Sequence, residues 1–235
     1  MLSFLFPKRC LLCHAFQAAS PPKAGLDGLC AGCADDLRRL YPDAVSVCPL
    51  CALPSAAGAV CGACQKRLPP HEGLWASLAY RAPLVQMVHQ WKHLGDSAML
   101  RPLVSLMADN PPPWLDEAGI DTLLAMPLSR ERRLFRGFNQ SGELAAALGG
   151  RFRLPLAAQD AVSRRHRPPQ STLPRDERRR NVRGIFQAAP SELAGKKVLL
   201  IDDVMTTGAS VAELGRSLRR AGAAAVFVWI LARNQ

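Results

Sequence analysis

Residues 198–210 read Val-Leu-Leu-Ile-Asp-Asp-Val-Met-Thr-Thr-Gly-Ala-Ser and combine two kinds of polar chemistry. The adjacent carboxylates Asp202 and Asp203 follow an apolar run and can accept hydrogen bonds from a sugar diol. The residues after them can bind a phosphate, because backbone N–H groups at a helix N-terminus form an anion site. These residues are Thr206, Thr207, Gly208, Ala209 and Ser210. The segment could thus bind a phosphate and the hydroxyls of a sugar side by side. The simpler alternative is an acidic turn followed by a helix cap, with no ligand.

All eight cysteines lie before residue 65, in four Cys-x-x-Cys pairs. Two such pairs supply four thiolates, the tetrahedral set that zinc accepts readily. We therefore expect two structural zinc ions, since the alternative, a disulfide framework, is typical of secreted proteins. Sequential pairing is the simplest arrangement, and a cross-braced one stays open. With sequential pairing, one site takes Cys10, Cys13, Cys30 and Cys33, and the other takes Cys48, Cys51, Cys61 and Cys64.

The elements that must position these motifs alternate between apolar strands and amphipathic helices. We predict strands over residues 74–80, 122–126, 197–201 and 225–231. Helical patterns cover residues 84–91, 100–107, 142–148 and 209–221, and Gly149-Gly150 is expected to end the third. Apolar strands separated by helices indicate an α/β fold, with a parallel sheet covered on both faces. We expect a boundary near residue 70, with a small metal-dependent domain over residues 1–70 and the α/β domain over residues 71–235.

The composition excludes a wholly disordered chain, because 49% of the residues are hydrophobic and 21% are charged. The longest unbroken apolar run, residues 223–232, has ten residues, whereas a membrane-spanning helix needs about 20. We therefore expect no membrane insertion. The first ten residues lack the basic and apolar regions of a secretory signal, so we expect a cytoplasmic location.

The excess of positive charge is concentrated in one part of the chain. The formal net charge is +11, and residues 130–183 hold 14 Arg, no Lys and five acidic residues. Because Arg suits bidentate contact with phosphate, a phosphorylated ligand or a nucleic acid is expected there. A solvated surface in an Arg-rich chain is the alternative. Between Cys10 and Cys64 acidic residues outnumber basic ones by four to three, so a protein partner fits the cysteine region at least as well as DNA.

Residues 202–210 resemble the phosphoribosyl pyrophosphate (PRPP) motif of type I phosphoribosyltransferases. The whole chain resembles the ComF/GntX family of bacterial DNA-utilisation and competence proteins. Besides the cysteine region, the resemblance rests on Arg136-Gly-Phe-Asn-Gln140 and on Gln170-Ser-Thr-Leu173, followed by Arg178, Asn181 and Phe186. It implies a type I phosphoribosyltransferase-like, twisted, mostly parallel sheet flanked by helices and preceded by a small zinc-ribbon domain.

The same resemblance implies roles for individual residues. Asp202 and Asp203 would hold the ribose 2′- and 3′-hydroxyls of PRPP, and residues 206–210 would bind its 5′-phosphate. The turn after the strand predicted over 122–126 resembles the pyrophosphate loop, where Mg²⁺ would be shared by the pyrophosphate and ribose oxygens. The candidate ligands of the pyrophosphate are Arg130, Arg133 and Arg136. Residues 164–181 correspond to the mobile loop that closes over PRPP in related enzymes.

Two classes of function fit these features. In the first, the chain is a PRPP-binding protein that serves DNA uptake or the use of DNA as a nutrient, with single-stranded DNA and a protein partner at the zinc ribbons as expected partners. In the second, it is an active PRPP-dependent transferase on an unknown small acceptor, with no direct nucleic-acid role. Hypoxanthine–guanine transferases carry an acidic residue at the position of Thr206, so no evident group here selects a nucleobase.

Overall fold

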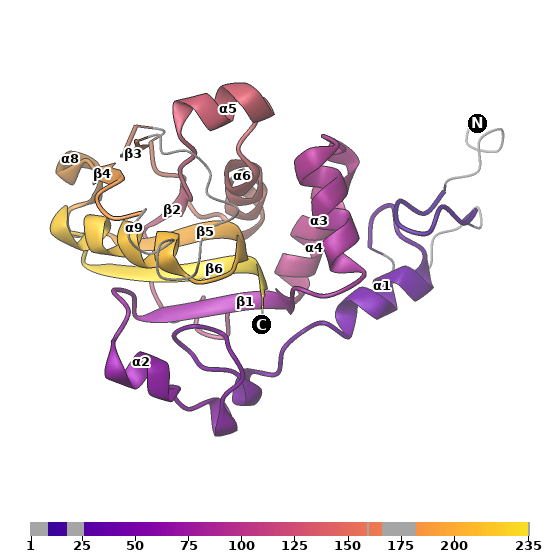
Figure 1. The fold of residues 1–235 in the computed structure, drawn as a ribbon, viewed down its shortest axis with the longest axis horizontal. Helices are drawn as coiled ribbons and strands as arrows, with labels where there is room; N and C mark the ends of the chain where they lie inside the picture. Colours follow the sequence, from indigo (N-terminus) through magenta and orange to yellow (C-terminus); the bar gives the residue numbers. More distant parts are fainter. Residues whose placement is uncertain (1–8, 18–25, 159, 166–181, 235) are drawn as a thin grey trace.

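The computed structural model of the protein describes residues 9–17, 26–158, 160–165 and 182–234 (Figure 1). The cysteine region contains α1 (Ala31–Arg38), η1 (Ala44–Ser46), η2 (Ala56–Gly58) and α2 (Gly62–Lys66). The helices that follow are α3 (Leu84–His93), η3 (Ser97–Met99), α4 (Leu100–Asp109), α5 (Arg130–Arg136), α6 (Gln140–Phe152), α8 (Pro190–Leu193) and α9 (Ala209–Arg220). The strands are β1 (Gly73–Ala79), β2 (Thr122–Ala125), β3 (Val162–Arg164), β4 (Phe186–Ala188), β5 (Lys197–Met205) and β6 (Ala225–Arg233).

The described strands form a four-stranded sheet in the order β1-β6-β5-β2 and a separate pair of β3 and β4. All neighbours in the larger sheet are parallel, whereas β3 and β4 are antiparallel. The prediction of a mostly parallel, helix-flanked sheet is therefore confirmed.

Both faces of the larger sheet are buried, as continuous apolar strands predict. Along β5, Val198 and Leu200 face a core that includes Leu214 of α9. The alternate residues Leu199 and Ile201 face a second core, built with α3, α4 and α6. All five residues are fully buried. The sheet is thus the middle layer of the fold, and its strand ends set the positions of the polar side chains.

Two predicted boundaries are wrong. Strand β5 continues past Ile201 to Met205, so Asp202 and Asp203 lie inside the strand, and Asp202 pairs in register with Ile230 of β6. Helix α6 passes through Gly149 and ends only at Phe152, and the residue that caps it, Arg153, has a φ of 55°. Gly149 permits a close approach instead of stopping the helix, because a Cβ there would lie 3.0 Å from the carbonyl oxygen of Leu154.

The cysteine region packs along the edge of the sheet and against two helices. Figure 1 shows α1 beyond α3 and α4, and α2 beside β1. Buried side chains of the cysteine region, including Leu29 and Leu37, share a core with Met87 of α3 and Leu103 of α4. Within the described parts of the chain, no helix is long and apolar enough to cross a membrane.

Candidate functional site

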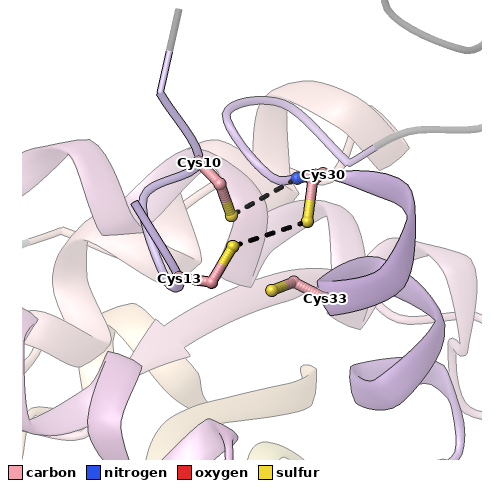
Figure 2. Close-up of side chains that lie close together, drawn as sticks. All are labelled: Cys10, Cys13, Cys30 and Cys33. Carbon is pink, nitrogen blue, oxygen red and sulfur yellow. Dashed lines mark hydrogen bonds between the residues drawn. The ribbon is translucent and has the colours of Figure 1, made fainter. Parts of the chain in front are cut away.

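The cysteines form two groups of four, and in each group the sulfur atoms all lie within 4.8 Å of one another. The groups follow the sequential pairing, and Figure 2 shows the first, with the two Cys-x-x-Cys turns facing each other. Sulfur atoms of opposite pairs lie 3.7 Å apart in both groups, between Cys13 and Cys30 and between Cys51 and Cys61. Four thiolates around one zinc at about 2.3 Å would stand roughly 3.8 Å apart. Each group therefore fits a structural zinc site.

The two groups also repeat one backbone contact. The N–H of Cys30 donates to the sulfur of Cys10 at 3.4 Å, and the N–H of Cys61 donates to the sulfur of Cys48 at 3.4 Å. Such N–H donors favour the thiolate, which is the form that binds metal. The cysteine region is accordingly built from two equivalent ribbons.

The pKa values of the thiols show why four of them need a cation. Although burial opposes ionisation, backbone N–H donors lower the pKa of Cys10 to about 6, and a backbone N–H of Cys64 lowers that of Cys61 to about 7. Burial and neighbouring sulfurs raise the pKa of Cys33 and of Cys64. Four crowded sulfurs cannot all ionise unaided, whereas a divalent cation stabilises the four thiolates together.

A second cluster of polar side chains gathers at the carboxyl end of β5. The hydroxyl of Ser141, in the first turn of α6, donates to Asp202 Oδ1 at 2.9 Å. The Nζ of Lys92, near the end of α3, lies 2.6 Å from Asp203 Oδ2. Helices from two different parts of the chain thus converge on the carboxylate pair.

Both carboxylates are largely withdrawn from solvent, although they lie near the end of a strand. Burial, together with the adjacent charge of Asp203, raises the pKa of Asp202 to about 7. The N–H of Asp203, Ser141 and Lys92 act in the opposite direction. A carboxyl group with such a pKa must release its proton before it can bind a cation.

The side chain of Arg164, at the end of β3, approaches the same place. Arg164 donates from Nη1 to the carbonyl of Pro127 at 3.1 Å, in the turn between β2 and α5. Burial and the charge of Arg132 lower the pKa of Arg164, while the charge of Asp202 raises it. Arg164 therefore brings a positive charge to the carboxylate pair and holds the turn after β2, for which the family resemblance implies contact with pyrophosphate.

The segment after β5 has the geometry expected of an anion loop. Gly208 has a φ of 72° and precedes the first residue of α9, Ala209. The N–H of Ala209 is held by Thr207 Oγ1 at 3.4 Å. The first N–H groups of a helix have no intrahelical acceptor, so they are available to an anion. Residues 206–210 thus present donors beside the carboxylate pair.

The remaining predicted residues do not all lie near the carboxylate pair. Arg130 and Arg133 are exposed on α5, and the contacts of the described residues do not join them to the carboxylates. The side chain of Arg136 and residues 166–181 of the expected closing loop lie outside the described residues. The RGFNQ signature spans the α5–α6 junction, where Asn139 Nδ2 donates to the carbonyl of Met126 at 3.2 Å.

Two residues of this cluster, Lys92 and Ser141, were missed by sequence reasoning. Lys92 carried a weak signal, because it is the only Lys between residues 67 and 195 of an Arg-rich chain. Ser141 directly follows the RGFNQ signature but carries no distinctive pattern. Both lie on helices remote in sequence from the carboxylates, so only tertiary packing reveals their role.

Comparisons with known proteins agree with this architecture. Residues 1–65 match the double zinc ribbon domain, and residues 136–235 match the phosphoribosyl transferase domain. The DNA utilization protein YhgH of Salmonella typhimurium is 33% identical over 97% of this chain and 98% of its own length. Competence protein F of Haemophilus influenzae is 27% identical over 99% of this chain and 100% of its own. Competence protein ComFC of Bacillus subtilis is 28% identical, over 84% of this chain and 80% of its own.

The fold and both sites define a phosphoribosyltransferase-fold protein with a double zinc ribbon at its N-terminus. The chain belongs to the ComF/GntX family, which includes DNA utilization protein YhgH and the ComF competence proteins.

Proposed function

We propose that this protein binds PRPP with Mg²⁺ at the carboxyl end of β5 and uses that site in the uptake or utilisation of DNA. The observation that carries the proposal is the convergence of four elements on one point. The carboxylate pair of β5, Lys92 of α3, Ser141 of α6 and Arg164 of β3 lie together, and the anion loop follows directly along the chain. The carboxylates would hold the ribose hydroxyls, and residues 206–210 would hold the 5′-phosphate.

The charges of the cluster suit a bound ligand of this kind. PRPP is strongly anionic, and two bare carboxylates would repel it. Lys92 and Arg164 offset that repulsion, and Mg²⁺ shared between the pyrophosphate and ribose oxygens would complete the neutralisation. Arg130, Arg133 and Arg136 on α5 are the candidate cations for the pyrophosphate, together with Arg164.

Calorimetric titration of the full chain with PRPP and Mg²⁺ tests this proposal. Replacing either carboxylate by its amide, Asp202→Asn or Asp203→Asn, removes an ionic acceptor without changing its shape. Each loss should cost about 1.5–3 kcal/mol, or roughly 10–150-fold in affinity. Asp121→Asn, at the amino end of the sheet, is the matched control. Unchanged PRPP affinity in both site variants, or no binding by the natural chain, would refute the proposal.

The role in DNA utilisation rests on the family and on the charge of the chain. Names of the relatives refer to DNA utilization and competence. Arg130 and Arg133 expose a cationic surface on α5, which suits the backbone of single-stranded DNA. On the first ribbon, Arg39 pairs with Asp36 at 3.0 Å, which leaves less free charge there. We therefore propose DNA contact at α5 and a protein partner at the ribbons, whose boundary with the sheet domain we place near residue 70.

A second candidate function is transfer from PRPP to a small acceptor that the sequence does not identify. Arg164 and Lys92 beside the carboxylates favour it, because preorganised cations stabilise a departing pyrophosphate. Pyrophosphate release from PRPP, measured with and without single-stranded DNA, distinguishes the two candidates. Release that needs no DNA, with water or an added small nucleophile accepting the ribosyl group, supports the transferase, whereas binding without release under any of these conditions supports the first proposal.

A further inference from the structure

The second cysteine site is connected to the anion loop through one buried side chain, that of Arg233. This residue ends β6 and is only 4% exposed. Its Nε donates to the carbonyl of Cys51 at 2.9 Å, and its Nη1 donates to the carbonyl of Met205 at 2.9 Å. The same Nη1 also donates to the carbonyl of Thr206, the first residue of the anion loop. One guanidinium therefore touches both a cysteine of the second site and the entrance of the loop.

The backbone around Cys51 is fixed by further contacts with the sheet domain. The carbonyl of Pro49 accepts the N–H of Leu74, in β1, at 2.8 Å. The carbonyl of Leu50 lies 2.8 Å from Nε2 of the buried His71. Successive carbonyls of the 48–51 turn thus dock on the sheet domain, and the last of them meets Arg233.

Burying a guanidinium costs free energy unless its N–H donors have acceptors. Moving one of these carbonyl acceptors away would therefore be unfavourable, which keeps them in place. A peptide unit is planar, and its C=O and N–H point in opposite directions. By holding the carbonyls of Met205 and Thr206, Arg233 therefore sets the direction of the N–H groups of Thr206 and Thr207. These N–H groups belong to the proposed phosphate cradle.

We propose that Arg233 is a positioning residue that makes the anion loop depend on the metal in the second cysteine site. The expected effect on PRPP affinity rests on the proposed function. The coupling between the metal site and the loop does not. When the four thiolates lose their cation, the 48–51 turn loosens and Arg233 loses a fixed acceptor. The carbonyl of Thr206 then loses this anchor, while that of Met205 keeps the N–H of Asn234 at 3.0 Å, so the order of the loop falls.

The first cysteine site provides the comparison. The described backbone bonds of its two Cys-x-x-Cys turns stay within the ribbon, from Leu11 N–H to the carbonyl of Gly28 and from His14 N–H to that of Cys10. The bond from the Ala79 N–H of β1 reaches only Leu40, seven residues beyond Cys33. It packs on α3 and α4 through apolar side chains instead. Loss of the first metal should therefore leave the anion loop ordered.

Amide hydrogen exchange of residues 206–210 in the full chain, without PRPP, tests the coupling directly. Cys61→Ser and Cys13→Ser each remove one metal, which zinc analysis verifies. Exchange in the loop should rise about tenfold in Cys61→Ser, because charged hydrogen bonds are broken, and stay unchanged in Cys13→Ser. Equal changes in both variants, or none in Cys61→Ser after its second metal has gone, would overturn the proposal.

A second pair of variants keeps the test decisive if Cys61→Ser does not fold. Arg233→Lys retains the charge but cannot reach acceptors on both sides, so loop exchange should again rise. Its control is Arg219→Lys, because Arg219 also donates to carbonyls, those of Ala223 and Ala224, but at the amino end of β6. Loop exchange that is unchanged in Arg233→Lys, or raised equally in Arg219→Lys, contradicts the proposal.

Titration with PRPP and Mg²⁺ then separates this inference from the proposed function. If the natural chain binds PRPP, Arg233→Lys should weaken binding about tenfold. If the natural chain binds no PRPP, the proposed function fails, while the exchange contrast between the two cysteine variants still decides the coupling.

Discussion

The ammonium group of Lys92 lies 2.6 Å from a carboxylate oxygen of Asp203, so α3 contributes a cation to the end of β5. Both side chains are mostly buried, with 16% and 15% exposure. In such surroundings an ion pair is only weakly screened by solvent. Lys92 therefore keeps two adjacent carboxylates from presenting an uncompensated negative charge to an anionic ligand.

Replacing Lys92 should weaken the binding of PRPP. Lys92→Met removes the cation and restores repulsion between the carboxylates and the ligand, so affinity should fall about tenfold, or about 1.4 kcal/mol. Lys92→Arg keeps the positive charge and should therefore retain most of the PRPP affinity of the natural chain. Calorimetry measures both, and Lys196→Met, at the amino end of β5, serves as the control. Tighter binding in Lys92→Met would show instead that Lys92 competes with the ligand.

The free energy of unfolding should depend on pH in a way that reflects the raised pKa of Asp202. Its pKa rises from an ordinary value of 3.8 to about 7 in the folded state, chiefly through burial and then through Asp203. Between these values the folded state binds more protons than the unfolded state, so the free energy of unfolding falls as the pH rises. Asp202→Asn removes this titration. As the pH rises from about 4 to about 7, it should therefore gain stability relative to the natural chain.

Urea unfolding of both proteins in zinc-containing buffer measures this difference. Comparison at equal pH cancels the titration of the cysteine ligands, which the two proteins share. Asp116→Asn is the control, because it changes the net charge alike but lies on an exposed segment. A constant stability difference across this pH range would contradict the raised pKa.

Metal removal should affect the two ribbons first. The purified protein should contain about two zinc ions, and a variant of one ligand, Cys33→Ser or Cys64→Ser, should contain about one. Chelation should raise amide exchange in residues 26–64 before it affects strands β5 and β6, because the ribbons draw folding energy from the metal. Metal analysis together with exchange measures both effects. Stable disulfides in place of the metal would contradict the prediction.

The exposed arginines of α5 should set the salt dependence of DNA binding. Arg130→Ala with Arg133→Ala should weaken binding of single-stranded DNA and flatten its dependence on salt concentration. The expected change in slope is roughly 0.7 for each phosphate that the double variant no longer neutralises. A control that removes the same charge elsewhere combines Arg101→Ala in α4 with Arg151→Ala near the end of α6. If the salt dependence of DNA binding has the same slope in the two double variants, the α5 arginines do not contact DNA and are only solvated surface residues.

Much of this architecture could be predicted because it depends on local patterns. Apolar runs give the buried strands of a parallel sheet, and four Cys-x-x-Cys pairs give two four-thiolate groups. The start of α9 after Gly208 could also be predicted, because a glycine before an amphipathic pattern is a local signal. Element ends were less predictable. The low helix propensity of Gly149 predicts that α6 ends there. The helix instead continues to Phe152, because Leu144 and Leu148 are fully buried and hold it against the core.

The sequence by itself determined the chemistry of each motif, because residue types and short spacings decide which ligands a segment can offer. Only the tertiary structure decided which distant groups meet. Lys92 and Ser141 reach the carboxylate pair because α3 and α6 pack against the carboxyl end of β5. Arg233 reaches Cys51, which lies 182 residues away in the sequence, because β6 ends beside both the second ribbon and the anion loop. These contacts depend on packing between remote segments, which no local pattern encodes.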